Sequence, residues 1–388
     1  MKKIFGFLIM LGIICNVSLA DTVIYEKPDV KIIVEGKNLE LGENVPIIVN
    51  SRTLVPLRKL LVGLGVPDNT TNIQWIPEKM AVKVEYNGVI IDLAIGSYDG
   101  YINGIKYALD SAPIIHKDRT YLPAKFVGEA LGYSLGWDPN TPAVIVTSNN
   151  NMTLLTNILN DLNTAMNNLE SYETISKKST KMISRYNDNI DIVEAQTTKL
   201  EQADLVKKIM YSETEYSDQN QKNFTFEYGT DEVLYSCYKY EEGGVLYNSG
   251  WKKYLYNART DEKTPYELKE KSGLIKIDES VYPTLAIMEL DNEYIIYTPT
   301  SQIDVLKVMD LDGLYKNATA VYNDVEKFSF IMSLDKESSL PKYLSVKMTT
   351  KSQETTRDEN AVEISEEINY EITFNKYNQY LELVLPEA

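Results

Sequence analysis

The chain has 388 residues, and its 56 aspartates and glutamates outnumber its 39 lysines and arginines, so the formal net charge is −17 at pH 7. A field of this sign repels nucleic acids and anionic lipid surfaces, so we expect no nucleic-acid partner. The length is sufficient for two or three separate hydrophobic cores.

The first twenty residues have the features of an export signal. Lys2 and Lys3 give a basic start, an apolar run follows from Ile4 to Cys15, and small residues stand at 18–20. The run is shorter than the ~20 residues that a spanning helix needs, so an uncleaved anchor is the less favoured alternative. Ile14 precedes Cys15 where a lipoprotein signal needs a small residue. We therefore predict a signal peptide over 1–20 and a secreted, extracytoplasmic protein associated with the cell envelope, with no transmembrane segment in the mature chain.

After cleavage Cys237 is the one remaining cysteine, so no intramolecular disulfide can form. It lies in a strand-like run, Val233 to Tyr238. A buried, inert thiol is the favoured interpretation, and a reactive thiol is the alternative.

One stretch of the chain occurs twice. Val45–Arg58 returns as Ala112–Lys125 at a constant offset of 67 residues. Apolar, proline and glycine positions match between the copies, but no nucleophile, base or metal ligand does. The duplication therefore favours scaffolding or binding over catalysis.

Each copy predicts a strand, a tight turn, a strand and a short helix. In the first copy Pro56 suits a first helical turn, and Gly65 ends an apolar stripe formed by Leu57, Leu60, Leu61 and Leu64. The second copy keeps the period up to Gly132, and Gly128 within it permits a close approach by a strand. Asn87-Gly88 and Asn103-Gly104 are strong hairpin signals. We predict two small antiparallel sheet-plus-helix repeats over 21–148.

These residues resemble a known family. Ser51–Arg58 with Leu64-Gly65 and Trp75, and Asp118–Pro123 with Leu131-Gly132-Tyr133 and Gly136-Trp137-Asp138, resemble the copper amine oxidase N-terminal, or stalk, domain of exported bacterial proteins. The resemblance covers roughly 30–148 and implies an accessory module without the oxidase chemistry.

A copper site of the oxidase kind needs several imidazoles, and the chain contains one histidine, His116. We therefore expect no metal and no other cofactor, and we place His116 as an exposed turn residue. Arg52 and Arg119 stand at matching positions of the two copies. Anion binding is one interpretation of them, and a paired structural role at the end of the sheet is the favoured one.

The pattern changes after residue 148. Asn149–Asn151 is predicted to be a polar linker, followed by a second domain over 152–388. Apolar residues from Leu155 to Leu169 recur every three or four positions, which predicts a helix of about five turns. Glu241–Gly244 is predicted to be a hairpin turn, and Ser301–Tyr322 to carry a further helix.

Alternation dominates the second domain. Apolar residues fall on one face in four groups: Phe328, Phe330, Met332 and Leu334; Leu344, Val346 and Met348; Ile368, Tyr370, Ile372 and Phe374; Leu381, Leu383 and Leu385. The fold class we predict is therefore α+β, with a large antiparallel half-barrel sheet after the repeats and helices covering its concave face. Either the helices cover the apolar face completely, or an apolar ligand fills a gap beneath them.

The second domain also resembles a family. The predicted helix, Gly250–Tyr254, Leu334–Pro341 and Ile372–Asn378 look like the LolA-like and LppX-like lipoprotein carriers. The resemblance implies a half-barrel that cradles acyl chains under helical lids, although this chain lacks a lipobox. No binding residue can be carried over.

No catalytic motif for nucleophilic, zinc or phosphate chemistry occurs. Asp310–Gly313 is set aside as a helix-end turn, because Val321 stands where a calcium loop needs an acid. We predict a non-enzymatic, exported envelope protein that has a stalk module and a domain for a lipid or other apolar ligand, with no catalytic residue assigned. The alternative is a wall-associated structural or adhesive protein that contacts peptidoglycan glycan. An enzyme is the least favoured option.

Overall fold

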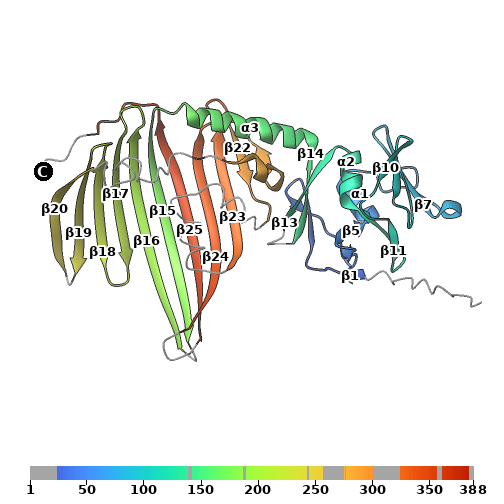
Figure 1. Cartoon of the computed structure of the whole chain (residues 1–388), viewed down its shortest axis with the longest axis horizontal. Coiled ribbons are helices and arrows are strands. Elements are labelled where there is room, and N and C mark those ends of the chain that lie inside the picture. Colours follow the sequence, from blue (N-terminus) through green and yellow to red (C-terminus); the bar gives the residue numbers. More distant parts are fainter. Residues whose placement is uncertain are drawn as a thin grey trace, which may run out of the picture.

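The computed structural model describes residues 24–138, 142–186, 189–242, 244–256, 275, 277–300, 324–355 and 361–383. Two bodies lie side by side, a stalk module and a large sheet (Figure 1). Nearly all strand pairs are antiparallel, so the α+β class with a large half-barrel sheet holds.

Three small sheets and two short helices make up the stalk module. The first sheet has the order β1-β4-β5-β12-β11, the second β10-β9-β8-β7-β6, and the third β13-β14-β2-β3. The two helices are α1 (Leu57–Gly63) and α2 (Ala124–Ala130), and a 3₁₀ turn, η1 (Pro77–Lys79), lies between them in the chain. The strands are β1 (Ile24–Glu26), β2 (Lys31–Val34), β3 (Lys37–Asn38), β4 (Ile47–Val49), β5 (Arg52–Pro56), β6 (Ile73–Ile76), β7 (Ala81–Tyr86), β8 (Val89–Ala94), β9 (Asp99–Ile102), β10 (Ile105–Ala108), β11 (Ile114–His116), β12 (Arg119–Pro123), β13 (Tyr133–Asp138) and β14 (Ala143–Ser148).

The two copies interlock, which differs from two separate sheet-plus-helix repeats. β5 of the first copy pairs with β12 of the second, with Val55 opposite Leu122. β14 pairs in parallel with β2, a strand that precedes the first copy. A unit of this size buries little apolar surface alone, so the copies share their cores. Leu57 and Leu61 of α1, for example, lie in one cluster with Leu122 and Val127.

Local predictions within the module are confirmed. Asn87 and Gly88 have φ values of 49° and 78° in the turn between β7 and β8, and Asn103 and Gly104 repeat this between β9 and β10. Both helices end before glycines with positive φ. A Cβ on Gly128 would lie 2.5 Å from Cδ1 of Leu135, so β13 does approach α2 closely there.

The predicted linker is wrong. Asn149–Asn151 forms the first turn of α3 (Asn149–Asn167). Oγ of Ser148 accepts a hydrogen bond of 3.3 Å from the backbone N–H of Asn151, so β14 runs directly into a capped helix. The stalk module is therefore joined to α3 without an intervening loop.

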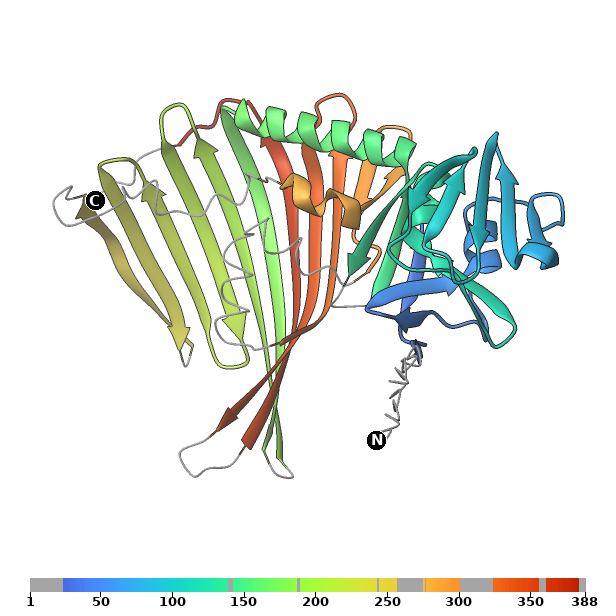
Figure 2. The same ribbon diagram turned by 45° about the vertical axis from the view of Figure 1, so that its right-hand side comes forward.

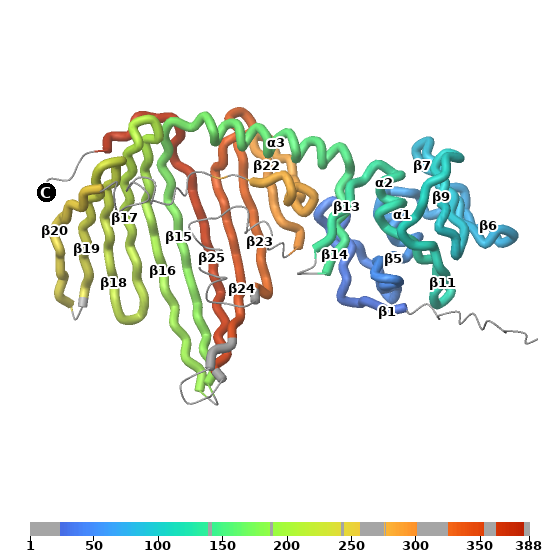
Figure 3. Tube along the Cα trace, in the orientation of Figure 1, coloured from blue at the N-terminus to red at the C-terminus, as the bar shows by residue number. Residues whose placement is uncertain are grey.

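The large sheet has eleven strands in the order β20-β19-β18-β17-β16-β15-β25-β24-β23-β22-β21. Figure 3 shows that the central strands reach well beyond their neighbours at one end. The strands are β15 (Ser171–Tyr186), β16 (Asn189–Asp204), β17 (Ile209–Asp218), β18 (Lys222–Gly229), β19 (Val233–Glu242), β20 (Val245–Leu255), β21 (Ala286–Glu289), β22 (Glu293–Tyr297), β23 (Asp324–Asp335), β24 (Pro341–Thr355) and β25 (Ala361–Tyr377). The predicted hairpin at 241–244 joins β19 to β20.

The apolar face of β23, β24 and β25 is confirmed. Phe330, Val346 and Ile372 are fully buried, and all three groups of alternating residues on these strands belong to one core. α3 crosses the upper part of this face (Figure 2). Its residues Leu155 and Leu159 enter the same core, as do Val281 and Tyr282 of the 3₁₀ helix η2 (Glu279–Thr284).

Among the described residues beyond β15, the core includes Ala203 of β16 but no buried residue of β17 to β20. On β18 to β20 aromatic residues lie on both faces: Phe226 meets Trp251 on one, and Tyr240 stacks on Tyr247 at 4.5 Å on the other. The apolar face therefore ends near the middle of the sheet. The fourth predicted strand group is also wrong, because Leu381 and Leu383 form no strand and Leu385 lies outside the described residues, as does the helix predicted over 301–322.

Two single-residue predictions have clear outcomes. Cys237 is buried, with its Sγ 3.4 Å from Oδ1 of Asn248. His116 is not an exposed turn residue. The offset of 67 aligns it with Val49, and it is the last residue of β11. Its Nε2 lies 2.8 Å from Oε1 of Glu26.

Within the part of the chain that the structure describes, no helix combines the length and apolar character needed to cross a membrane. No group of three or more potential metal-ligating side chains gathers there either.

Candidate functional site

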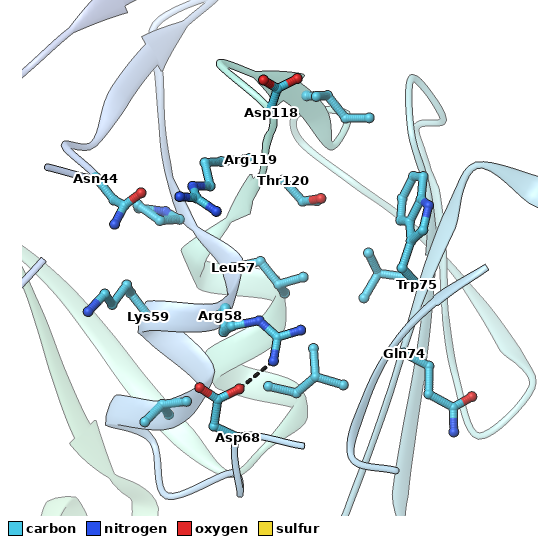
Figure 4. A pocket seen from close by; sticks show the side chains of 15 residues that line it. Asn44, Leu57, Arg58, Lys59, Asp68, Gln74, Trp75, Asp118, Arg119 and Thr120 are labelled. Carbon is cyan, nitrogen blue, oxygen red and sulfur yellow. Dashed lines mark hydrogen bonds and ion pairs between the residues drawn. The ribbon is translucent and has the colours of Figure 1, made fainter. Parts of the chain in front are cut away.

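A hollow of about 620 Å³ lies in the stalk module, where the first copy meets the turn of the second (Figure 4). Three elements form its walls: α1 with the loop after it, the β6–β7 pair, and the turn between β11 and β12. Such a hollow between elements is a common setting for ligand binding.

The first wall follows from the amphipathic pattern of α1. Leu57, Leu60 and Leu61 are buried in the cores, which leaves Arg58 and Lys59 on the opposite side toward solvent. Asp68, in the loop after the helix, forms an ion pair with Arg58. The side chain of Asn69 accepts hydrogen bonds from the backbone N–H groups of two following residues, which shapes this loop.

The second wall comes from strand alternation. Ile73, Trp75 and the cross-strand partner of Trp75, Val82, share one face of the β6–β7 pair. Ile73 and Val82 are buried, whereas the indole of Trp75 extends beyond the core and is 44% exposed. Figure 4 shows this indole on the side of the hollow opposite α1.

The third wall is a tight turn. Lys117 and Asp118 have φ values of 47° and 57°, the left-handed conformation of a two-residue hairpin turn. Glu26 of β1 anchors the turn, because its Oε1 lies 2.6 Å from Nζ of Lys117 and 2.8 Å from Nε2 of His116. The hydrogen bond from Lys117, followed by that from His116, lowers the pKa of Glu26 below its usual value. Arg119 and Thr120 are thereby held at the rim of the hollow.

Only some of the cationic side chains in the hollow have an acidic partner. Arg58 is neutralised by Asp68, but within the described residues neither Arg119 nor Lys59 forms an ion pair. Figure 4 shows the carboxylate of Asp118 at the outer rim, away from the guanidinium of Arg119. The hollow thus combines an exposed aromatic ring with uncompensated cations and the amides of Asn44 and Gln74.

Two shallower hollows lie on the polar face of the large sheet. One, of about 390 Å³, runs over β16, β15 and β25, and the other, of about 420 Å³, over β25, β24 and β23. They share Lys347 and Asn369 and contain no tryptophan or tyrosine. None of the three hollows lies between α3 and the described part of the sheet.

No site residue could be assigned from the sequence alone, and the structure explains why. Arg52 has the predicted structural role, since its Nε lies 3.2 Å from Oδ2 of Asp110. Arg119 does not share it. Trp75 was recognised as part of the repeat only, and its exposure depends on where β6 ends relative to the core. An exposed tryptophan beside unpaired arginine is the signal, but neither property is readable without the fold.

The first module has a defined family. Residues 33–146 match the family model of the copper amine oxidase N-terminal domain, so the resemblance predicted for this part of the chain is confirmed. The whole lining of the 620 Å³ hollow lies within this match. No curated protein matches the chain.

Solved structures similar to the chain include a DUF1329 family protein from Desulfovibrio piger, at 9% identity, with 60% of this chain and 95% of that one covered and a TM-score of 0.18. A putative outer membrane lipoprotein-sorting protein domain from Vibrio parahaemolyticus has 8% identity, coverage of 60% and 95%, and a TM-score of 0.16. Ail of Yersinia pestis, in complex with the heparin analogue sucrose octasulfate, has 7% identity, coverage of 53% and 100%, and a TM-score of 0.16. A lipoprotein-sorting domain, the kind of protein that the second domain resembles in sequence, is thus among the structures found.

Proposed function

We propose that this protein is an extracytoplasmic, non-enzymatic component of the cell envelope that binds a saccharide of the wall in the hollow of its stalk module. The observation that carries the proposal is the exposed indole of Trp75 facing polar and cationic side chains across about 620 Å³. The large sheet then serves as a self-supporting body to which the binding module is fixed by α3.

The chemistry of the hollow suits a sugar ring. The C–H face of a pyranose packs on an exposed indole, while its hydroxyl and amide groups need donors and acceptors at the ring edge. Thr120 supplies both kinds of group, and Arg119 supplies further donors. Asn44 and Gln74 supply acceptor oxygens, while their amide nitrogens donate to the carbonyl oxygens of Leu41 and Thr71. A purely apolar ligand would bury the hydroxyl, the guanidinium and the amide oxygens without partners, which costs about 1–3 kcal/mol for each group.

Carriage of a lipid by the large sheet is the other candidate. The size of the apolar face supports it, but the packing beneath α3 does not. Leu155, Leu159 and Leu162 of the helix are fully buried against the face, and Met332, Leu334 and Leu344 of the sheet are fully buried as well. The part of the face beneath α3 is packed by the helix, so it leaves no room there for an acyl chain.

The proposal is tested by co-sedimentation of the purified protein with peptidoglycan and by calorimetric titration with soluble wall glycan fragments. We expect saturable binding that Trp75→Ala weakens about tenfold. Trp137→Ala is the matched control, because Trp137 is also 44% exposed and also faces a valine of its hairpin partner, but lies outside the hollow.

A parallel titration with a fluorescent fatty acid distinguishes the two candidates. Glycan binding that depends on Trp75, with no fatty-acid binding, supports the proposal. Fatty-acid binding without any glycan binding would overturn it in favour of lipid carriage.

A further inference from the structure

The stalk module has two equivalent arginines, one in each copy, and the surroundings of the two side chains can be compared. β5 and β12 run antiparallel about Val55 and Leu122, which are themselves 67 residues apart. This register relates the two copies by a pseudo-twofold axis. Arg52 and Arg119 begin β5 and β12, so they occupy equivalent places at opposite ends of the strand pair.

Their partners differ. The guanidinium of Arg52 lies 3.2 Å from the carboxylate of Asp110 and also donates to the carbonyl oxygen of Ser51 at 3.4 Å. Asp110 belongs to the connection between β10 and β11, and its carboxylate reaches the arginine of the first copy. The offset of 67 aligns Asp110 with Glu43, which precedes the first copy, but within the described residues Glu43 is exposed and forms no ion pair with Arg119.

Arg119 therefore keeps its guanidinium unpaired among the described residues, and this guanidinium lines the hollow that Trp75 closes on the other side. We infer that Arg119 binds a carboxylate of the ligand, as Arg52 binds the carboxylate of Asp110. The preferred saccharide therefore carries a carboxylate. This inference rests on the proposed function and specifies its ligand class.

Geometry and charge support a single carboxylate rather than a polyanion. The planar guanidinium presents a fork of donors that matches the two oxygens of one carboxylate. A polyanion would meet the field of a chain with a net charge of −17. Trp75 and Arg119 line the same hollow, so a sugar with one acidic substituent can place its ring on the indole and its carboxylate on the guanidinium. Of the two aspartates in the lining, Asp68 is paired with Arg58, and Asp118 lies at the outer rim.

The test uses the disaccharide of N-acetylglucosamine and N-acetylmuramic acid, and the methyl ester of its carboxylate as the neutral match. We expect the unmodified protein to bind the free acid about tenfold more tightly than the ester, equivalent to about 1.4 kcal/mol. Arg119→Gln should abolish this preference, because it should weaken binding of the acid about tenfold more than binding of the ester. Arg52→Gln is the control, since it removes the equivalent guanidinium outside the hollow and should leave the preference intact.

The outcomes separate the two proposals. Equal binding of acid and ester, with both weakened by Trp75→Ala, would overturn the role of Arg119 and leave saccharide binding standing. Binding of neither disaccharide would overturn both. Thermal unfolding of each variant shows whether Arg119→Gln remains folded, and Arg119→Lys, which keeps the charge but loses the fork, should retain a reduced preference.

Discussion

Glu35 and Asn151 join the two bodies of the protein. Oε2 of Glu35, in the turn between β2 and β3, accepts a hydrogen bond of 2.7 Å from Nδ2 of Asn151 in the first turn of α3. Oε1 of the same carboxylate accepts a hydrogen bond of 2.6 Å from the backbone N–H of Ser148. One side chain from the start of the stalk module thus holds the first turn of the helix that covers the large sheet.

Replacing Glu35 should loosen this junction. Glu35→Ala leaves a half-buried backbone N–H and an amide without their acceptor, so we expect a loss of about 1–3 kcal/mol in the free energy of unfolding. Glu40→Ala removes a solvent-exposed glutamate from the same segment and should have little effect. Denaturant unfolding monitored by fluorescence measures both, and equal stability of the two variants would contradict the role of Glu35.

The contact between β13 and η2 offers a second test of the junction. A Cβ at Gly136 would lie 2.8 Å from the backbone carbonyl oxygen of Pro283, which cannot turn aside. Gly136→Ala should therefore displace η2 and cost about 1–3 kcal/mol of unfolding free energy. In Gly63→Ala the new methyl group would also meet an atom at 2.8 Å, but that atom is Cδ1 of Leu39, which can rotate away. We expect a smaller loss there, and the same measurement compares the two.

Because α3 packs on the large sheet, shortening one of its buried side chains should leave a cavity and lower the free energy of unfolding. Leu159 is fully buried in the core that α3 shares with β23, β24 and β25. Leu159→Ala should lower the free energy of unfolding by about 3 kcal/mol, whereas the exposed Asn157→Ala should not. If Leu159→Ala were neutral, α3 would not be closing the apolar face, and the case for a ligand beneath it would revive.

Asp335 predicts a response to acid. Its carboxylate accepts hydrogen bonds from the backbone N–H of Ser338 and from Lys342, which lower its pKa from 3.8 to about 2 in the folded protein. Because the folded pKa is below the unfolded one, the stabilisation is complete above about pH 4 and is lost as the pH falls toward 2. Asp335→Asn should cost about 1 kcal/mol at neutral pH. The variant and the parent should converge in stability as the pH falls through this window.

Short-range patterns were sufficient for much of the fold. The Asn-Gly turns, the stripe of α1 and the alternation from Phe328 to Leu334 are each determined by a few neighbouring residues, and all three are as predicted. The first turn of α3 was misread because polar residues alone suggest a linker, whereas Ser148 in front of them is a helix cap.

Long-range pairings decide what the sequence could not predict. The pairing of β5 with β12 places Arg119 against the hollow, and the connection that carries Asp110 satisfies Arg52 but not Arg119. The division of aromatic residues between two faces of β18 to β20 also depends on strand register, which no local pattern specifies. The candidate site is therefore a product of topology rather than of a motif.

The most direct test of saccharide binding uses Trp75 as its own reporter. In a variant with Trp137→Phe and Trp251→Phe, Trp75 is the sole remaining tryptophan of the three in the chain. Titration with the disaccharide of N-acetylglucosamine and N-acetylmuramic acid should then give a saturable change in emission, with the same affinity that calorimetry measures. Calorimetric binding without any change in the emission of Trp75, or no binding by either method, would contradict the account.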